Sequence, residues 1–360
     1  MRVGTYFFIQ STPGRSEAEI ILEEVEQMVL SEELGFDSIW LTEHHYADYG
    51  LSSAPGVLLA TLAARTRRVR LGMAVYVLPF HHPLRLAEET ANLDIISGGR
   101  LTVGIGRGNR PREYAGHMID QQTSRSRLEE GTEVLLQAWT QDSVTYSGKH
   151  WNFDGIPVLP KPLTKPHPPV AVAAMSPESV AWTARNGFQL LNSGLTTPLD
   201  DTLKQRELYA EALASSQPPE VASALLSLWG VTKHVYVAPT DEEARADAEP
   251  AQRWYTDAFI RSLSPDGIKG LPEATYADAE RMRQGLSVLD FDKLVEGPLL
   301  IGSPETVGRK VSELQGHGVG ELICWMSFGG LAPEKVRRSM SLFASEVLPQ
   351  VRRATADMTA

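Results

Sequence analysis

The strongest constraint on the fold is a regular alternation of short apolar runs with longer segments of helical periodicity. The first run covers residues 3–9, and residues 17–34 then carry apolar side chains three and four positions apart, up to Gly35. Further apolar runs, each followed by a helical pattern, occupy residues 36–42, 69–78, 101–105, 170–174, 188–191, 228–237 and 321–326. Eight such units predict an α/β fold whose parallel strands close into a (β/α)₈ barrel, the TIM barrel.

Two segments interrupt this alternation. Residues 142–168 contain Tyr146, Trp151 and Phe153 among many prolines, a pattern that predicts a small hairpin outside the barrel. Residues 262–300 are rich in glycine, proline and charge, and they exceed the length of an ordinary connection. We expect this second segment to form a lid near the open face. The whole chain, residues 1–360, is therefore predicted to be one barrel domain with two insertions.

Charge and cysteine content exclude several classes of function. The chain has 34 Lys and Arg against 45 Asp and Glu, a formal net charge of -11, so it lacks the positive excess that binding to nucleic acid requires. Its single cysteine, Cys324, lies in the last predicted strand, so neither an intrachain disulfide nor a cysteine zinc site is expected. The N-terminus has no signal-peptide layout and no apolar run approaches the ~20 residues of a membrane span, which predicts a cytoplasmic protein.

The tripeptide Glu43-His44-His45 directly follows the second predicted strand. Catalytic groups of such barrels lie at the carboxyl ends of the strands. A carboxylate and two imidazoles at that position can hold a substrate or move protons, so all three are candidate catalytic residues. The structural alternative is that one histidine caps a helix while the other packs. His81 and His82 follow the third strand and are either functional or turn residues.

Three further features predict anion binding on the same face of the barrel. The turn from Gly104 to Gly108 contains Arg107, but the third glycine of a dinucleotide fingerprint would fall at Asn109, so a Rossmann site is rejected. Ser124-Arg125 begins one predicted helix, and Ser176 with Ser179 begins the next. Hydroxyl groups and arginines at helix N-termini suit a phosphate, although ordinary helix capping is the commoner use of such serines.

Several motifs together resemble the bacterial luciferase-like, flavin-dependent monooxygenases along the whole chain. The matching segments are Gly35 to His45, Val77-Leu78-Pro79 with His82-Pro83, Gly99-Arg100-Leu101, Gly104 to Gly108, Lys165 to Pro169, Gly302 to Glu305 and Glu346 to Pro349. The resemblance implies a TIM barrel that binds FMN delivered in reduced form by a separate reductase. Oxygen would add to this flavin, and the resulting peroxyflavin would oxidise a small organic substrate, such as an aldehyde, a ketone or a natural-product intermediate.

The resemblance also implies roles for individual residues. His44 matches the catalytic histidine, with Glu43 and His45 as its neighbours, and Ala74-Val75 matches a cis peptide bond beneath the flavin ring. Gly106 stands where the luciferases have a reactive cysteine, which leaves room over the ring. The remaining cofactor contacts are expected from Arg107, Arg125, Ala174, Met175, Ser176 and Ser179, with Met175 contributing its backbone. No metal is expected.

Two other functions fit the same barrel. A deazaflavin-dependent dehydrogenase would need positive charge for a longer cofactor tail, which Arg110 and Arg112 can supply. A flavin-storing protein like the non-fluorescent flavoproteins would have lost part of the barrel, whereas all eight units are present here. The leading prediction remains the monooxygenase, acting as a homodimer with a transient reductase partner, a small-molecule substrate, and neither nucleic acid nor a membrane.

Overall fold

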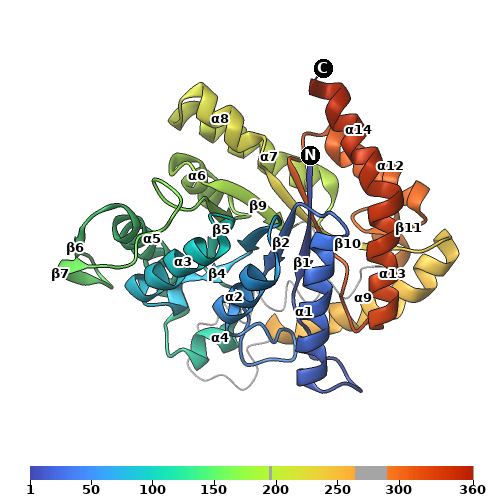
Figure 1. Ribbon diagram of the computed structural model, residues 1–360, viewed down its shortest axis with the longest axis horizontal. Coiled ribbons are helices and arrows are strands. Elements are labelled where there is room, and N and C mark those ends of the chain that lie inside the picture. The colour runs from blue at the N-terminus through green and yellow to red at the C-terminus, as the bar shows by residue number, and fades with distance from the viewer. Residues whose placement is uncertain (194–196, 264–289, 360) are drawn as a thin grey trace.

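The predicted closed barrel is confirmed by the computed structural model, which describes residues 1–193, 197–263 and 290–359, with 354–359 as backbone only. The strands of the ring run parallel (Figure 1). The ring closes because the last strand, residues 321–325, pairs with the first strand, residues 2–7, and with the strand at residues 230–237. In spatial order these strands are β1 (Arg2–Phe7), β2 (Ser38–Leu41), β3 (Arg70–Met73), β5 (Leu101–Gly106), β8 (Val170–Ala173), β9 (Gln189–Ser193), β10 (Gly230–Val237) and β12 (Glu321–Trp325).

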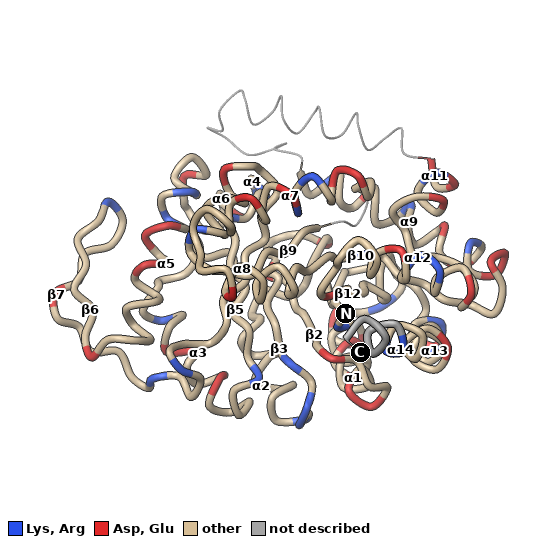
Figure 2. Tube along the Cα trace, turned by 90° about the horizontal axis from the view of Figure 1, so that it is seen from above, with Lys and Arg blue, Asp and Glu red and all other residues tan. Residues whose placement is uncertain are grey.

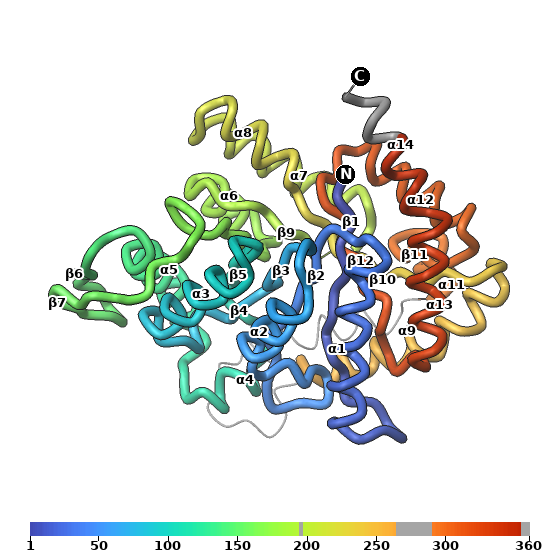
Figure 3. The backbone as a smooth tube through the Cα atoms, in the orientation of Figure 1, coloured from blue at the N-terminus to red at the C-terminus, as the bar shows by residue number. Residues whose placement is uncertain are grey.

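The strands form where apolar residues follow one another without alternation, as expected for parallel strands covered on both faces. Every residue of β10 and β12 is buried. Helices surround this ring (Figures 1 and 3). Their bounds are α1 (Glu17–Glu33), α2 (Pro55–Arg65), α3 (Pro83–Ser97), α4 (Pro111–Gly116), α5 (Ser124–Thr140), α6 (Pro177–Arg185), α7 (Leu199–Ser216), α8 (Pro219–Leu226), α9 (Asp241–Leu263), α11 (Phe291–Glu296), α12 (Pro304–Gly316), α13 (Pro333–Leu342) and α14 (Leu348–Thr359).

Short elements extend the regular barrel. The segment expected to form a hairpin contains β6 (Ser143–Ser147) and β7 (Asn152–Pro157), which pair antiparallel and project from one end of the molecule (Figure 2). A two-residue strand, β4 (Tyr76–Val77), pairs with β5. Strand β11 (Leu300–Gly302) adds to β10 and precedes α12, and neither of these two elements is predicted by the sequence. Most of the expected lid, residues 264–289, lies outside the described residues.

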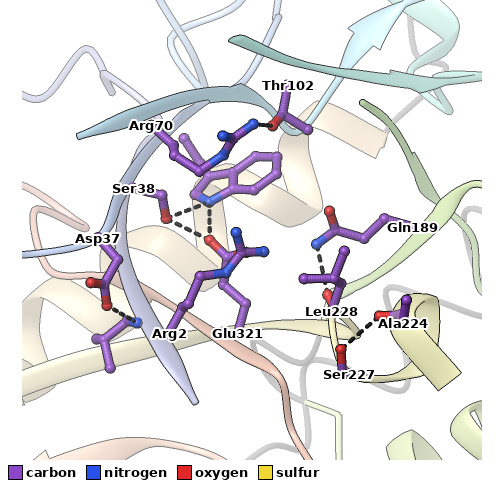
Figure 4. A network of polar contacts seen from close by, with 12 residues as sticks. Arg2, Asp37, Ser38, Arg70, Thr102, Gln189, Ala224, Ser227, Leu228 and Glu321 are labelled. Atoms are coloured by element: carbon purple, nitrogen blue, oxygen red, sulfur yellow. Dashed lines mark hydrogen bonds and ion pairs between the residues drawn. The ribbon is translucent and has the colours of Figure 1, made fainter. Parts of the chain in front are cut away.

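A buried carboxylate ties the strands together at the amino-terminal end of the barrel. Glu321, at the start of β12, accepts hydrogen bonds from Ser38 Oγ at 2.5 Å and Trp40 Nε1 at 2.9 Å. Arg2 of β1 forms an ion pair with the same carboxylate at 2.8 Å (Figure 4). Since polar groups at this end of a TIM barrel serve stability, we assign the network a structural role.

Aromatic side chains fill the opposite, carboxyl end. The ring of Trp325 stacks on Phe8 with centroids 4.8 Å apart and meets Tyr255 edge-on at 5.1 Å. His234 is fully buried beside them, and burial lowers its pKa to about 3 although Gln252 contributes a hydrogen bond. These side chains form an apolar floor on which a ligand site can be built. None of the helices formed by the described residues combines the length and apolar composition that crossing a membrane would need.

Candidate active site

A cavity of about 610 Å³ opens at the carboxyl ends of the strands. Its walls come from the segments that follow β2, β3, β5, β8 and β9, so residues far apart in the sequence meet there. Most of the predicted site residues line it, namely Glu43, His44, Ala74, Val75, Gly106, Arg107, Ala174, Met175, Ser176 and Ser179. The two predicted residues that do not line it are His45, which faces a smaller adjoining cavity, and Arg125, which contacts Ser179.

His44 is oriented by a carboxylate that the sequence analysis missed. Glu113, on the short helix α4, places Oε1 2.7 Å from His44 Nδ1 and accepts a hydrogen bond from the backbone N–H of His45 at 3.0 Å. The imidazole also stacks on Phe8, with ring centroids 4.5 Å apart. A carboxylate oxygen accepts hydrogen bonds, so His44 Nδ1 donates in this contact and Nε2 is left for another partner.

Glu43 is the centre of a second, buried network. Its oxygens accept hydrogen bonds from the backbone N–H of Val77 at 2.7 Å, from His45 Nε2 at 2.8 Å and from His81 Nε2 at 2.9 Å. Burial by itself would raise the pKa of Glu43, but these hydrogen bonds hold the pKa at about 2. For His81, burial acts to lower the pKa, and the Glu43 carboxylate outweighs it and raises the pKa. Glu43 is therefore a fixed negative charge near neutral pH and joins the segments after β2 and β3.

Two segments of the backbone lie close together on one side of the large cavity. The expected cis peptide bond between Ala74 and Val75 is present, and Tyr6 Oη donates a hydrogen bond to the carbonyl of Ala74 at 3.2 Å. Across from it, a Cβ added to Gly106 would meet Val75 Cγ2 at 2.5 Å. Any larger residue at position 106 would therefore displace Val75 or enter the cavity.

The predicted anion-binding groups after β8 do come together. Ser176 caps α6 by accepting from the backbone N–H of Ser179 at 3.3 Å, and its hydroxyl donates to Ser179 Oγ at 2.9 Å. Arg125, from the first turn of α5, donates to the same Ser179 Oγ at 3.2 Å, and Glu178 and Glu129 hold its guanidinium at 3.0 and 3.2 Å. The positive end of the α6 dipole adds to this cation, so the cluster suits a phosphate.

Arg107 lies beside this cluster and lines the same cavity. It follows β5, which pairs with β8 through Ile105 and Val172, so the segments after the two strands are neighbours. Its side chain is exposed, and among the described residues no ion pair holds it in place. Arg107 is therefore free to turn toward an anion in the cavity.

A smaller cavity of about 230 Å³ adjoins the large one. The two cavities share four lining residues: His44, Tyr49, Arg110 and Glu113. From the sequence, Arg110 is considered as a possible cation for a cofactor tail and, with Asn109, as a replacement of apolar or aromatic residues that the luciferases have in the substrate pocket. The available signal for a site role was its place directly after the glycine-rich turn. Among the residues described, no cluster of three or more histidine, cysteine or acidic side chains is arranged to hold a metal ion.

A (β/α)₈ barrel with a large cavity and a histidine–carboxylate pair at the carboxyl ends of its strands has the architecture of a TIM-barrel enzyme. Residues 1–321 match the family of luciferase-like monooxygenases. The chain is 31% identical to an alkanal monooxygenase alpha chain of Photorhabdus luminescens over 97% of both chains. It is 27% identical to the oxygenase component of the flavin-dependent trigonelline monooxygenase of Acinetobacter baylyi, over 93% of this chain and 91% of that one.

A solved structure agrees with these relatives. The crystal structure of monooxygenase RslO1 from Streptomyces bottropensis superposes with a TM-score of 0.85 at 29% identity, covering 98% of this chain and 100% of that one. The protein therefore belongs to the luciferase-like monooxygenase family, and it is an enzyme, a flavin-dependent monooxygenase.

Proposed function

We propose that the protein is the oxygenase component of a two-component system that uses reduced FMN and O₂ to oxidise a small organic substrate. The observation that carries this proposal is one cavity joining the Ser176–Ser179–Arg125 cluster, the Ala74–Val75 segment and the His44–Glu113 pair. Its volume of about 610 Å³ lies within the range of roughly 300–1,000 Å³ that is usual for cofactor and ligand sites. The residues present therefore fit a mononucleotide.

Each part of FMN has a matching part of the cavity. Arg107, Arg125, Ser176 and Ser179 would hold the phosphate through charge-assisted hydrogen bonds. Gly106 and the Ala74–Val75 segment would border the ring, and the segment carrying Ala174 and Met175 would close the opposite wall. When bound, the reduced flavin supplies the electrons that activate O₂.

The chain itself supplies proton handling and exclusion of water. His44 would accept or return a proton at Nε2, while Glu113 stabilises the positive charge that develops on the ring. Phe8, Tyr49 and Tyr255 surround this position with aromatic walls that keep water away from the reacting atoms. Glu43 would act through His45 and His81 as a positioning residue rather than as a proton donor.

A separate reductase is part of this proposal. FMN must be reduced before it can activate O₂, and the glycine-rich turn at residues 104–108 lacks the third glycine of a dinucleotide site. The net charge of -11 also provides no general attraction for a second, dinucleotide ligand. A homodimer and a cytoplasmic location remain predictions from the sequence; light scattering on the purified protein tests the first.

The competing function is a deazaflavin-dependent dehydrogenase. Anaerobic equilibrium dialysis with reduced FMN and with a reduced deazaflavin of the longer-tailed kind separates the two functions. We expect reduced FMN to bind at least tenfold more tightly than the deazaflavin. A reversed preference would refute the proposed function.

A further inference from the structure

Arg110 is a buried cation. Its side chain is 4% exposed, and neither Nε nor Nη1 has a hydrogen-bond partner in the part of the chain that the structure describes. Among the described residues, no acidic side chain forms an ion pair with it. A guanidinium stays protonated at any physiological pH, and a buried charge is costly unless it is paired. The arrangement therefore indicates an anion that arrives with a ligand.

Two aromatic rings hold the guanidinium in place. Arg110 Cζ lies 4.7 Å from the ring centroid of Tyr49 and 4.6 Å from that of Phe259. These two centroids are only 5.8 Å apart, so the rings approach from adjacent directions and not from opposite faces. The backbone carbonyl of Arg110 also accepts from the N–H groups of Glu113 and Tyr114. The two rings thus hold the guanidinium, and Arg110 lines both cavities.

The surroundings of Arg110 carry an excess of positive charge. Arg110, Arg112 and Arg261 line the smaller cavity together with the acids Asp48 and Glu113. Asp48 is paired with Arg261 at 3.1 Å, and Glu113 is paired with His44 at 2.7 Å. The three arginines outnumber the two carboxylates, so the lining of the smaller cavity carries one positive charge in excess, in a chain whose net charge is -11. Helices α4 and α9, which carry Arg110's neighbours, lie on the same side of the molecule (Figure 2).

The position of Arg110 separates it from the expected phosphate site. It lines both cavities at their shared wall, next to His44, whereas Ser176 and Ser179 line the large cavity alone. A ligand in the smaller cavity would therefore meet Arg110 and His44 at the same time. A cavity of about 150 Å³ admits benzene, so the volume of about 230 Å³ found here accommodates one ring with a carboxylate.

We propose that the smaller cavity is the substrate subsite and that Arg110 binds the carboxylate of a single-ring organic acid. This inference rests on the proposed function and assigns its substrate class. The planar guanidinium would bind the carboxylate in a bidentate manner, through two parallel hydrogen bonds, as such groups commonly do. The ring of the acid would then lie in the smaller cavity beside Arg110 and next to His44.

The test compares acids with their neutral amides on the full-length protein saturated with oxidised FMN. The probes are benzoate, nicotinate and cyclohexanecarboxylate, each paired with its carboxamide, and binding is measured by equilibrium dialysis. For the wild type we expect at least one acid to bind tenfold or more tightly than its amide. Equal binding of acid and amide in all three pairs would overturn the inference while leaving the proposed function intact.

Three variants locate the effect. Arg110→Met keeps the length and apolar contacts but removes the charge, and it should weaken binding of the preferred acid at least tenfold and abolish the preference. Arg110→Lys keeps the charge without the planar group and should retain part of the preference. Arg85→Met, an exposed arginine of α3, is the matched control and should behave as wild type.

FMN affinity, measured in the same variants, distinguishes the substrate from the cofactor. We expect Arg110→Met to bind FMN as tightly as the wild type. A variant that loses FMN affinity but keeps the preference for acids would assign Arg110 to the cofactor and overturn the inference. Failure of the wild type to bind reduced FMN under anaerobic conditions would instead refute the proposed function.

Discussion

His44 Nδ1 and Glu113 Oε1 lie 2.7 Å apart, although 69 residues separate them in the chain. The contact joins the segment after β2 to the short helix after β5 and fixes which nitrogen of the imidazole carries a proton. A second hydrogen bond, from the backbone N–H of His45 to the same oxygen, holds the carboxylate in place. The pair lies at the wall shared by both cavities, and in the proposed function it would act as a proton relay.

Replacement of either partner should lower turnover. His44→Ala removes the proton acceptor and should reduce turnover by ~10²-fold or more, the usual contribution of general acid–base catalysis. Glu113→Gln keeps the size of the side chain but removes its charge, so it should reduce turnover by a smaller factor. Both variants should bind FMN as the wild type does, as measured by flavin fluorescence.

The double variant tests whether the two residues act as a unit. Groups that act through one another give strongly non-additive effects on rate. We expect His44→Ala with Glu113→Gln to be no slower than His44→Ala alone. If the two losses multiply, Glu113 acts independently of His44. Wild-type turnover in His44→Ala would make the histidine structural.

The phosphate cluster predicts a selective loss of cofactor affinity. Arg125→Ala and Arg107→Ala should each weaken FMN binding roughly tenfold or more, because a hydrogen bond to a charged group contributes ~1.5–3 kcal/mol. Arg127→Ala is the matched control on the same helix, since the Arg127 guanidinium donates to Thr123, whereas that of Arg125 donates to Ser179 of the cluster. Unchanged FMN affinity in both test variants, or an equal loss in the control, would refute the assignment of Arg107 and Arg125 to the FMN phosphate.

Glu24 predicts a pH-dependent stability difference. Burial raises its pKa from 4.5 to about 8, although Ser327 Oγ donates a hydrogen bond at 2.9 Å that opposes the shift. Between these two values the folded protein keeps the proton that the unfolded chain releases, so Glu24 makes stability fall as the pH rises from about 4.5 to about 8. Glutamine does not titrate, so Glu24→Gln should gain stability relative to wild type across this window.

Urea unfolding at pH 5 and pH 8.5 measures this difference. We expect the advantage of Glu24→Gln to grow by on the order of 3 kcal/mol between the two conditions. Glu33→Gln, an exposed carboxylate on the same helix, should show no such growth. A constant difference between Glu24→Gln and wild type would mean that Glu24 does not hold its proton in the folded state.

The barrel was predictable because its strands are continuous apolar runs and its helices have clear periodicity. Strand β11 was missed since it has only three residues, Leu300–Gly302, and is followed at once by Ser303-Pro304. A run that short has no period to detect. The hairpin β6–β7 was visible through its aromatic residues and prolines, which interrupt the repeat.

The site was predictable where its residues directly follow long strands. Glu43, His44 and the Ser176–Ser179 pair were found in this way. Because the carboxyl ends of the strands share one face of the barrel, Arg125 was also expected near Ser179, from which 54 positions separate it in the chain. Glu113 and Arg110 were not assigned their roles, because α4 is only six residues long and leaves no helical pattern. The position of a side chain on so short a helix depends on tertiary packing.

The measurement that tests the central claim most directly records incorporation of oxygen into the product and consumption of NAD(P)H in the same reaction. The purified protein is incubated with FMN, NAD(P)H, ¹⁸O₂ and the ring acid that binds best, with and without an unrelated flavin reductase. We predict negligible NAD(P)H consumption without the reductase, and a product carrying one ¹⁸O atom when it is present. NAD(P)H oxidation by the protein alone, or an oxidised product without ¹⁸O, would contradict the account.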